Sequence, residues 1–403
     1  MERTILHCDL NSFFASVELL SLPNLREKPV AVCGNPENRH GIILAKNEPA
    51  KKYGVATAET IWQAKRKCPE LILIPPHREQ YYKYSRLVNE IYESYTDRVE
   101  PFGIDESWLD ITETMHLFGG SGQKIADRIR QQIWEELGLT ISVGVSFNKI
   151  FAKLGSDYKK PNATTVITRE NYRQLLYPLP VSALLYVGHA AENTLRSMGV
   201  RTIGELARLD KDVLSRALGK AGESLYEYAN GLDQSPVRFA NEREEVKSVG
   251  NGMTFSRNLE GEADVRAGVA FLTDSVASRL RRAGLKGATV HIYIKNPKFQ
   301  SISKQKALPH PTDLSRELFA AVMELVEQCW RYSDPVRMMT ITVTNLVESD
   351  CAEQLSLFDT SRPHREKLEK LETAVDGVRS RFGKGIIQQG RILHNDIGVE
   401  IKK

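Results

Sequence analysis

The chain has 403 residues, of which 41% are hydrophobic and 26% charged, and its formal net charge is +4. This length is enough for two to four domains, each able to bury its own core. No long apolar run or signal-peptide pattern is present, which excludes membrane-spanning and secreted classes and predicts a cytoplasmic protein. Five scattered cysteines without a CxxC pair give neither a zinc spacing nor a disulfide framework, so we expect reduced thiols.

The N-terminal segment predicts a short buried strand that ends at an acidic residue. Residues 4–8 are mostly apolar and Asp9 follows them. Asn11 and Ser12 are natural N-caps for a helix that begins at Phe13. Residues 24–77 then alternate short apolar runs with a lysine-rich helix, which indicates a small α/β subdomain.

The next segment predicts the rest of the sheet to which the first strand belongs. A helix is expected over residues 81–95, a hairpin over 99–112, a helix with isoleucines at four-residue intervals from Ile125, and a strand over 140–145. The order strand, helix, hairpin, helix, strand is that of a split βαβ sheet.

Two carboxylates, Asp105 and Glu106, lie at the tip of the predicted hairpin. Such a pair usually marks only a turn. Together with Asp9 at a strand end of the same predicted sheet, however, they bring three hard oxygen ligands near one point. This donor set suits Mg²⁺ and predicts phosphoryl-transfer chemistry.

The second half of the chain predicts a helical module over residues 170–234, a unit with element order βαββαβ over 246–348, and a polar tail with a charged helix at 365–381. A segment without Asp or Glu carries a basic stripe of Arg279, Arg281, Arg282, Lys286, Lys295, Lys298, Lys304 and Lys306. Alternation over residues 289–295 predicts a strand, so these cations are expected on a sheet face that suits a phosphate backbone; a solvated face is the other reading.

Three blocks carry a resemblance to a known family: residues 9–18, 103–106 and 146–161. They resemble, in order and spacing, the three signatures of the Y-family, or lesion-bypass, DNA polymerases. The resemblance implies an α+β multidomain right-hand polymerase fold. The implied parts are a βαββαβ palm (1–10 and 78–168), small fingers (11–77), a helical thumb with a helix-hairpin-helix (169–234), a linker (235–245), a βαββαβ little finger (246–348) and a tail (349–403).

The resemblance also implies the residues of an active site. Asp9, Asp105 and Glu106 would be catalytic residues that hold two Mg²⁺ ions, with the backbone carbonyl of Leu10 as a further oxygen ligand. Phe14 stands where the family keeps an aromatic steric gate against a ribose 2′-hydroxyl; the alternative is core packing.

Two lysines are implied as contacts of the incoming triphosphate. Lys160 precedes Pro161 as in the family, and Lys51 lies where an arginine is frequent. Both could instead be ordinary surface residues. Glu48 replaces a frequent tyrosine in the same segment, so the sequence departs from the family pattern there.

Further segments imply macromolecular partners. Gly188 lies in a stretch that resembles a helix-hairpin-helix gripping the backbone of primer–template DNA, although Tyr186 replaces a common glycine. The basic βαββαβ unit resembles the little finger, which implies that its stripe contacts the duplex. Gln354, Leu355, Leu357 and Phe358 match the pentapeptide that binds the bacterial sliding clamp (beta subunit); an amphipathic strand is the alternative.

These observations predict a monomeric, error-prone DNA polymerase that uses deoxynucleoside triphosphates to extend primers past damaged bases. No proofreading is expected, because every segment is assigned and no second acidic group stands out. Two other classes of protein share part of this pattern. A non-catalytic paralogue could discard its carboxylates, whereas this chain keeps all three. A nucleotide cyclase shares paired acidic residues but would not need the helix-hairpin-helix, the basic sheet or the clamp peptide.

Overall fold

The structure is a computed structural model that describes residues 2–35, 41–242, 245–350, 362–393 and 395–399; of residues 362–364 it describes the backbone alone. The chain divides into two compact units, Met1–Arg243 and Glu244–Lys403, so their boundary falls inside the segment expected to be a linker. Over the described residues the strands form three sheets, two in the first unit and one in the second.

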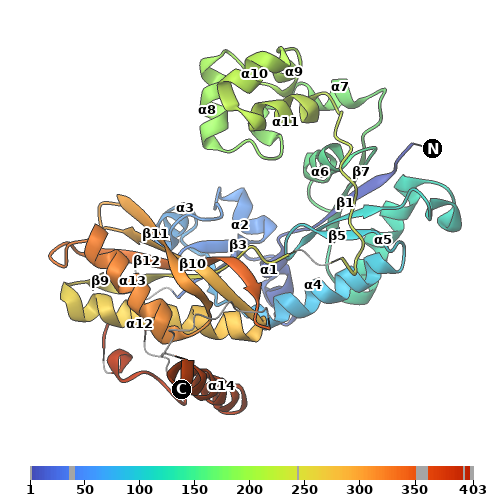
Figure 1. Ribbon diagram of the computed structural model, residues 1–403. Coiled ribbons are helices and arrows are strands. Elements are labelled where there is room, and N and C mark those ends of the chain that lie inside the picture. The colour runs from blue at the N-terminus through green and yellow to red at the C-terminus, as the bar shows by residue number, and fades with distance from the viewer. Residues whose placement is uncertain (1, 36–40, 243–244, 351–361, 394, 400–403) are drawn as a thin grey trace. The chain divides into compact units, whose positions relative to one another are not determined.

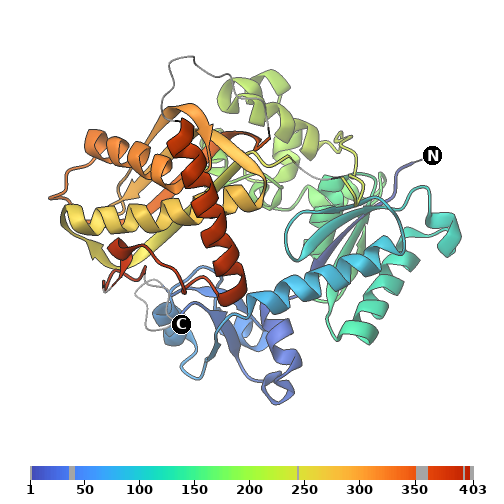
Figure 2. The same cartoon turned by 60° about the horizontal axis from the view of Figure 1, so that its bottom comes forward.

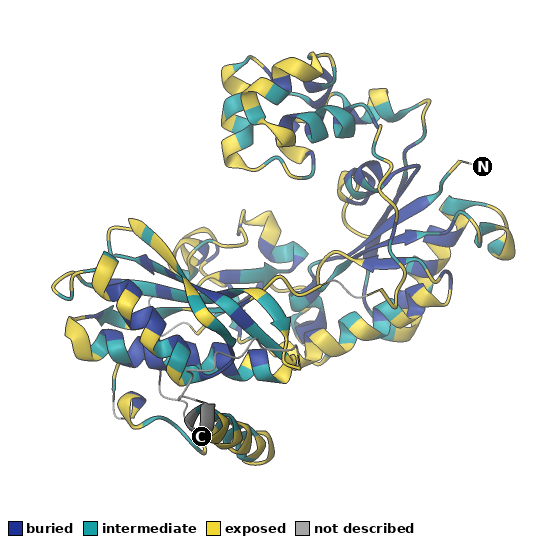
Figure 3. Cartoon of the chain, viewed as in Figure 1, coloured by how far each residue is buried: buried dark blue, intermediate teal, exposed yellow. Residues whose placement is uncertain are grey.

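The first unit is built on a five-stranded sheet with the order β5-β6-β1-β7-β8 over the described residues. Its strands are largely buried (Figure 3), because α6 covers one face and α4 and α5 cover the other (Figure 1). The predicted order of strand, helix, hairpin, helix and strand is confirmed. The elements are β1 Ile5–Leu10, α4 Arg78–Glu93, β5 Val99–Pro101, β6 Glu106–Asp110, a 3₁₀ turn at Met115–Phe118, α5 Gly122–Leu137, β7 Ile141–Ser146, α6 Lys149–Tyr158 and β8 Thr164–Val166.

Between β1 and α4 the chain forms a helix and a smaller sheet with the order β3-β2-β4. The elements are α1 Phe13–Leu20, a 3₁₀ turn at Pro23–Leu25, β2 Val30–Cys33, β3 Ile43–Lys46, α2 Glu48–Lys52, α3 Ile61–Lys67 and β4 Ile72–Ile74. The expected capping pair before α1 is wrong. Ser12 adopts a left-handed conformation (φ 50°) and its side chain makes no capping hydrogen bond. The amide of Asn11 is buried and instead donates to Ser142 Oγ at 2.9 Å.

A helical module completes the first unit. Its elements are α7 Tyr172–Leu176, a 3₁₀ turn at Val181–Ala183, α8 His189–Ser197, α9 Ile203–Ala207, α10 Lys211–Leu218 and α11 Lys220–Ala229. The buried residues of these helices share one core with Phe147 and Phe151, next to and within α6. After α11 the chain returns along the sheet, where the Arg3 guanidinium donates to the carbonyls of Asp233 (3.1 Å) and Ser235 (2.9 Å).

The second unit has a four-stranded sheet with the order β11-β10-β12-β9 over the described residues. The predicted order βαββαβ is confirmed. Helices α12 and α13 pack on one face of this sheet and enclose its core. The elements are β9 Ser248–Leu259, α12 Gly261–Arg282, β10 Leu285–Lys295, β11 Ser301–Thr312, α13 Ser315–Cys329 and β12 Val336–Glu348.

The C-terminal segment belongs to the second unit. It contains α14 Arg362–Phe382, which confirms the expected charged helix, and a 3₁₀ turn at Gly390–Ile392. Helix α14 crosses α12 (Figure 2). Further along the segment, Ile392, Ile397 and Val399 are buried in the hydrophobic core of this unit. The segment is therefore a cap on this unit. No described helix combines the length and the apolar composition needed to cross a bilayer.

Candidate active site

The three predicted acidic residues come together at one end of the five-stranded sheet. Strands β1 and β6 pair antiparallel with Asp9 opposite Glu106. Beyond this pair the Leu10 N–H donates to the Asp105 carbonyl at 3.0 Å, which places the backbone of Leu10 next to the hairpin turn. Because residues opposite each other on paired strands point to the same face, Asp9 and Glu106 both face α6.

Two lysines contact these carboxylates. Lys160 Nζ, predicted to contact the triphosphate, lies 2.6 Å from Asp9 Oδ2. Lys153 Nζ lies 3.2 Å from Asp9 Oδ2 and 2.9 Å from Glu106 Oε2. Sequence reasoning did not single out Lys153; its position four residues after Lys149 on the helix that covers the sheet was the available signal. Both lysines also pair with Asp157, at 3.3 and 2.8 Å.

The two aspartates are short of positive charge. Burial raises the pKa of Asp9 to about 6, although the charges of Lys160 and Lys153 act in the opposite direction. Burial and the charge of Glu106 raise the pKa of Asp105. For Glu106 burial acts upward too, but the contact with His7 and the charge of Lys153 outweigh it and hold the pKa well below its usual range. An additional cation would relieve this excess of negative charge.

The donor set fits a hard divalent cation. Two aspartates and a glutamate supply carboxylate oxygens, the ligands that Mg²⁺ prefers. Glu106 Oε2 is buried without an aligned hydrogen bond among the described residues. Without an ion, the three carboxylates do not form a ready-made metal site. In the described parts of the chain, no three His, Cys, Asp or Glu side chains are close enough together to hold a metal ion. Lys153 and Lys160 supply the positive charge instead.

Phe14 lies on α1 and is partly buried. Its ring is stacked on that of Tyr81 in α4, with centroids 4.1 Å apart and planes at 7°. Tyr81 is buried and its hydroxyl donates to Glu18, which also accepts from the His77 backbone N–H at 3.0 Å. The stack therefore rests on an anchored ring, which fixes the position of Phe14.

Among the described residues, Lys51 contacts Glu48 and none of the three carboxylates of the site. Its Nζ pairs with Glu48 Oε1 within α2, at 2.5 Å, and both side chains are well exposed. Glu48 also accepts a hydrogen bond from Ser12 Oγ at 3.3 Å. The two residues that depart from the family pattern thus neutralise each other.

In the helical module, Gly188 is the N-cap residue of α8. Tyr186, which stands where glycine was expected, has a φ of 70°, the left-handed conformation that favours glycine. Its side chain is 64% exposed and lies 6.0 Å from the ring of Tyr228. The hairpin before α8 therefore keeps the backbone conformation of a glycine turn without the glycine.

The expectation that the basic stripe lies on one sheet face is wrong. Val290 and Ile292 of β10 are buried under α12 and α13, and their partners on β11 are Lys306 and Lys304. These two lysines therefore lie on the helix-covered side of the sheet. Lys306 pairs there with Glu324 of α13.

The opposite face of this sheet is lined mainly by hydroxyl-bearing and small residues. The structure describes every residue of the basic stripe. By strand register Lys295 lies on this face, and Lys298 lies in the turn between β10 and β11. A Cβ at Gly252 would come within 2.3 Å of Thr340 Oγ1, so glycine keeps the surface flat there. The residues of this face include Ser248, Gly250, Gly252, Thr254, Thr289, His291, Tyr293, Lys295, Ser301, Ser303, Gln305, Ala307, Met338, Thr340, Thr342 and Thr344.

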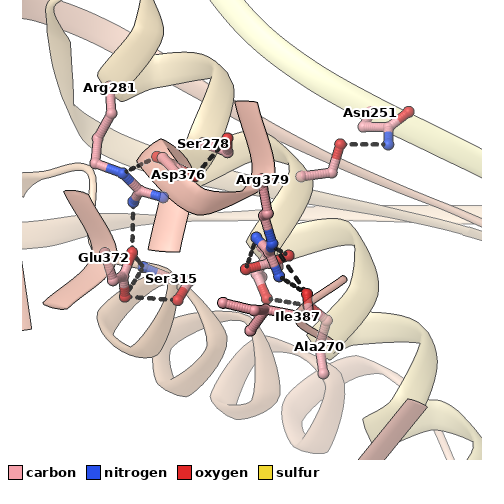
Figure 4. A network of polar contacts seen from close by, with 12 residues as sticks. Asn251, Ala270, Ser278, Arg281, Ser315, Glu372, Asp376, Arg379 and Ile387 are labelled. Atoms are coloured by element: carbon pink, nitrogen blue, oxygen red, sulfur yellow. Dashed lines mark hydrogen bonds and ion pairs between the residues drawn. The ribbon is translucent and has the colours of Figure 1, made fainter. Parts of the chain in front are cut away.

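Two further stripe residues are neutralised by α14. Arg281 pairs with Glu372 and, at 2.7 Å, with Asp376 (Figure 4), and its side chain is only 11% exposed. Lys286 pairs with Glu369 at 3.2 Å. Neither has the free charge that contact with a phosphate backbone requires.

The remaining arginines of the stripe lie on the last turn of α12. Arg279 donates to the carbonyl of Gly250, and Arg282 is exposed. The expected clamp-binding residues Gln354, Leu355, Leu357 and Phe358 lie outside the described residues.

Comparisons with known proteins agree with the fold. Family models described as "impB/mucB/samB family", its "C-terminal domain" and "DNA polymerase-iota, thumb domain" match residues 8–157, 246–357 and 184–233. The chain is 50% identical to a DNA polymerase IV of Acetivibrio thermocellus over 98% of both chains. It is 36% identical to DNA polymerase IV 1 of Bacillus subtilis, over 98% of this chain and 94% of that one.

A solved Y-family DNA polymerase chimera has the same fold. It superposes with a TM-score of 0.74 at 23% identity, over 86% of this chain and 99% of the chimera. The right-hand polymerase fold inferred from the sequence is confirmed. With full-length relatives well above 30% identity, this chain belongs to the DNA polymerase IV group of the Y-family of DNA-directed DNA polymerases.

Proposed function

We propose that the chain extends primers past damaged template bases by two-metal nucleotidyl transfer and does not proofread. The observation that carries the proposal is the group of Asp9, Asp105 and Glu106 at the end of the five-stranded sheet, where burial raises the pKa of both aspartates. Buried carboxylates short of positive charge are what Mg²⁺ coordination requires.

The chain's own residues have separate tasks in this reaction. Asp9, Asp105 and Glu106 would hold two Mg²⁺ ions, which supply activation of the primer 3′-hydroxyl and charge neutralisation of the leaving pyrophosphate. Lys160, 2.6 Å from Asp9, is placed to pair with the triphosphate once an ion takes over its contact. Phe14, fixed by its stack on Tyr81, would exclude a 2′-hydroxyl.

The DNA contacts are proposed on two surfaces. In the second unit, the glycine- and hydroxyl-lined sheet face with Lys295 and Lys298 offers hydrogen-bond donors and a flat approach to the phosphate backbone. In the first unit, backbone N–H groups at Gly188 would grip the backbone of the duplex. Four stripe residues are not proposed as DNA contacts. Arg281 and Lys286 pair with α14, and Lys304 and Lys306 lie on the helix-covered side of the sheet.

The proposal also includes the absence of proofreading and the binding of a sliding clamp. The absence of proofreading is proposed from the sequence, in which no second group of acidic residues stands out. The pentapeptide ending at Phe358 supports binding to the bacterial sliding clamp, which would raise the local concentration of a monomeric cytoplasmic enzyme at the primer end.

A primer-extension panel tests the function. Templates with no lesion, with an abasic site and with a bulky base adduct are each copied with Mg²⁺, and a mismatched primer end is offered in parallel. The proposal predicts extension across at least one lesion and no removal of the mismatched nucleotide. Arrest at every lesion, or excision of the mismatch, would contradict it.

The clamp assignment has its own test. Addition of a bacterial clamp should lengthen the products of the wild-type chain and leave those of Leu357→Ala unchanged. Equal stimulation of both chains would refute the assignment without affecting the polymerase reading.

A further inference from the structure

A buried histidine lies directly beneath the acidic group. In the register of β1 with β6, His7 is opposite Trp108 and Asp9 is opposite Glu106, so all four side chains face α6. His7 is fully buried. Its ring packs edge-on against Trp108 with centroids 5.2 Å apart, which limits how the imidazole can turn.

Close packing of α6 on the sheet explains the position of this histidine. The residue opposite His7 on β7 is Gly144. A Cβ at Gly144 would come within 1.9 Å of the Ala152 carbonyl oxygen and 2.4 Å of the Ser156 backbone nitrogen. Glycine therefore lets the helix lie against the strand, and this brings Ser156 onto the imidazole.

Both ring nitrogens of His7 face polar atoms. Nδ1 lies 2.8 Å from Ser156 Oγ. Nε2 lies 3.3 Å from Glu106 Oε2, and neither of these two buried atoms has an aligned hydrogen bond among the described residues. Buried polar atoms are rarely left unpaired in native structures, so two that face each other are each other's natural partner.

The chemistry of the two nitrogens decides how they pair. The carboxylate oxygen that faces Nε2 can only accept a hydrogen bond, so Nε2 must carry a hydrogen for the two atoms to pair. With the hydrogen on Nδ1, the Nε2 lone pair would point at a carboxylate. With the hydrogen on Nε2, it donates to Glu106, and Nδ1 accepts from the Ser156 hydroxyl. In the structure that hydroxyl donates to the Lys153 carbonyl at 2.8 Å, and rotation of the hydroxyl about its C–O bond would let it donate to Nδ1 instead.

We propose that His7 is a positioning residue for Glu106. Its Nε2–H holds Oε2 from beneath and leaves the other carboxylate oxygen to bind a metal ion, while Ser156 contacts the opposite nitrogen of the ring. This inference rests on the proposed metal-binding role of Glu106. Hydrogen bonds of this kind to a ligating carboxylate orient the ligand and tune its affinity for the ion.

Lys153 also contacts Oε2 of Glu106, at 2.9 Å, but the two contacts differ in permanence. A divalent ion would take over the charge that the flexible lysine side chain now supplies. His7 is fixed by the strand register and by Trp108, so its contact remains when the ion is bound.

Two substitutions in the full-length chain test the proposal. His7→Leu keeps apolar bulk and removes the donor, whereas His7→Gln keeps an N–H group near the position of Nε2. The readouts are Mn²⁺ binding without DNA or nucleotide, the Mg²⁺ concentration for half-maximal primer extension, and the thermal midpoint in EDTA. We expect His7→Leu to weaken both metal readouts by roughly 10- to 100-fold and His7→Gln to stay within about threefold of wild type.

The EDTA melt separates positioning from a structural role. His7→Leu removes one partner of the buried Glu106 oxygen, so its midpoint is expected to fall somewhat below that of wild type. A role in stability alone would lower the midpoint without shifting the metal readouts. If the variant does not fold, Ser156→Ala serves instead, since losing the donor to Nδ1 should shift both metal readouts in the same direction.

Unshifted metal readouts in His7→Leu, or equal defects in His7→Leu and His7→Gln, would overturn the role of His7. A wild-type chain without any Mg²⁺-dependent extension would instead refute the proposed function. The two failures are thus distinguishable.

Discussion

Replacing Asp9 by asparagine should stabilise the metal-free chain. The pKa of Asp9 rises from its ordinary 3.8 to about 6 in the folded state, chiefly through burial. At about 1.4 kcal/mol for each tenfold change in proton affinity, ionised Asp9 destabilises the fold by about 3 kcal/mol. Asparagine resembles the protonated acid and cannot ionise, so it escapes this penalty.

The sign of the pH dependence follows from the same pKa. The folded state keeps the Asp9 proton up to about pH 6, whereas the unfolded chain loses it near 3.8. Between these values unfolding releases a proton, so wild-type stability falls as the pH rises and the loss is complete above about pH 6. The advantage of Asp9→Asn should therefore be about half of the full 3 kcal/mol at pH 5 and reach all of it at pH 8.

Urea unfolding in EDTA at pH 5 and pH 8 measures this difference. Asp157→Asn is a suitable control, because it removes a partner of both Lys153 and Lys160 and should not stabilise the chain. Mg²⁺ should stabilise wild type more than Asp9→Asn. The reasoning is refuted if Asp9→Asn is less stable than wild type at pH 8, or if its advantage does not grow with pH.

Three further substitutions test other parts of the structure. Phe14→Ala should lower the discrimination against ribonucleotides by at least tenfold, measured as the ratio of kcat/KM for deoxy- and ribonucleotide insertion, a difference of about 1.4 kcal/mol. Arg281→Leu should destabilise the second unit by about 3–5 kcal/mol in urea unfolding, because Glu372 and Asp376 lose a buried partner. Ile397→Ala should cost about 2–5 kcal/mol in the same measurement, since the side chain is fully buried.

Each of these predictions has an outcome that would contradict it. Unchanged ribonucleotide rejection by Phe14→Ala would favour the core-packing reading of that ring. The control for Arg281 is Lys306→Leu, which breaks a more exposed ion pair and should change stability by less than about 1 kcal/mol. Equal effects of the two would show that α14 does not depend on its pairing with Arg281. Full stability of Ile397→Ala would mean that the C-terminal segment is not part of the core.

The acidic group could be inferred from the sequence because its position depends on local structure. A strand that ends at Asp9 and a hairpin that turns at Asp105 need only short-range patterns to be recognised, and their pairing follows from the element order. Lys153 and His7 could not be inferred in this way. Their contacts depend on how closely α6 packs on the sheet, which a single glycine at position 144 permits.

The basic stripe shows where sequence reasoning fails. Successive residues of a strand point to opposite faces of the sheet. A stripe of cations in the sequence therefore does not show on which face each side chain lies until the strand register is known. Lys304 and Lys306 prove to lie on the helix-covered side of the sheet, paired across the strands with Ile292 and Val290 of β10. Arg281 is not free to contact DNA because it pairs with residues of α14 that lie more than 90 residues away in the sequence. No local sequence pattern predicts such contacts.

The most direct test of the account is the rate of single-nucleotide insertion on a primed template with Mg²⁺, compared between wild type and the variants Asp9→Asn, Asp105→Asn and Glu106→Gln. DNA affinity is measured for each protein in parallel. If these carboxylates hold the catalytic ions, each substitution should lower the insertion rate by roughly a hundredfold or more and leave DNA affinity largely unchanged. A variant that inserts nucleotides within a few-fold of the wild-type rate would contradict the assignment of the site.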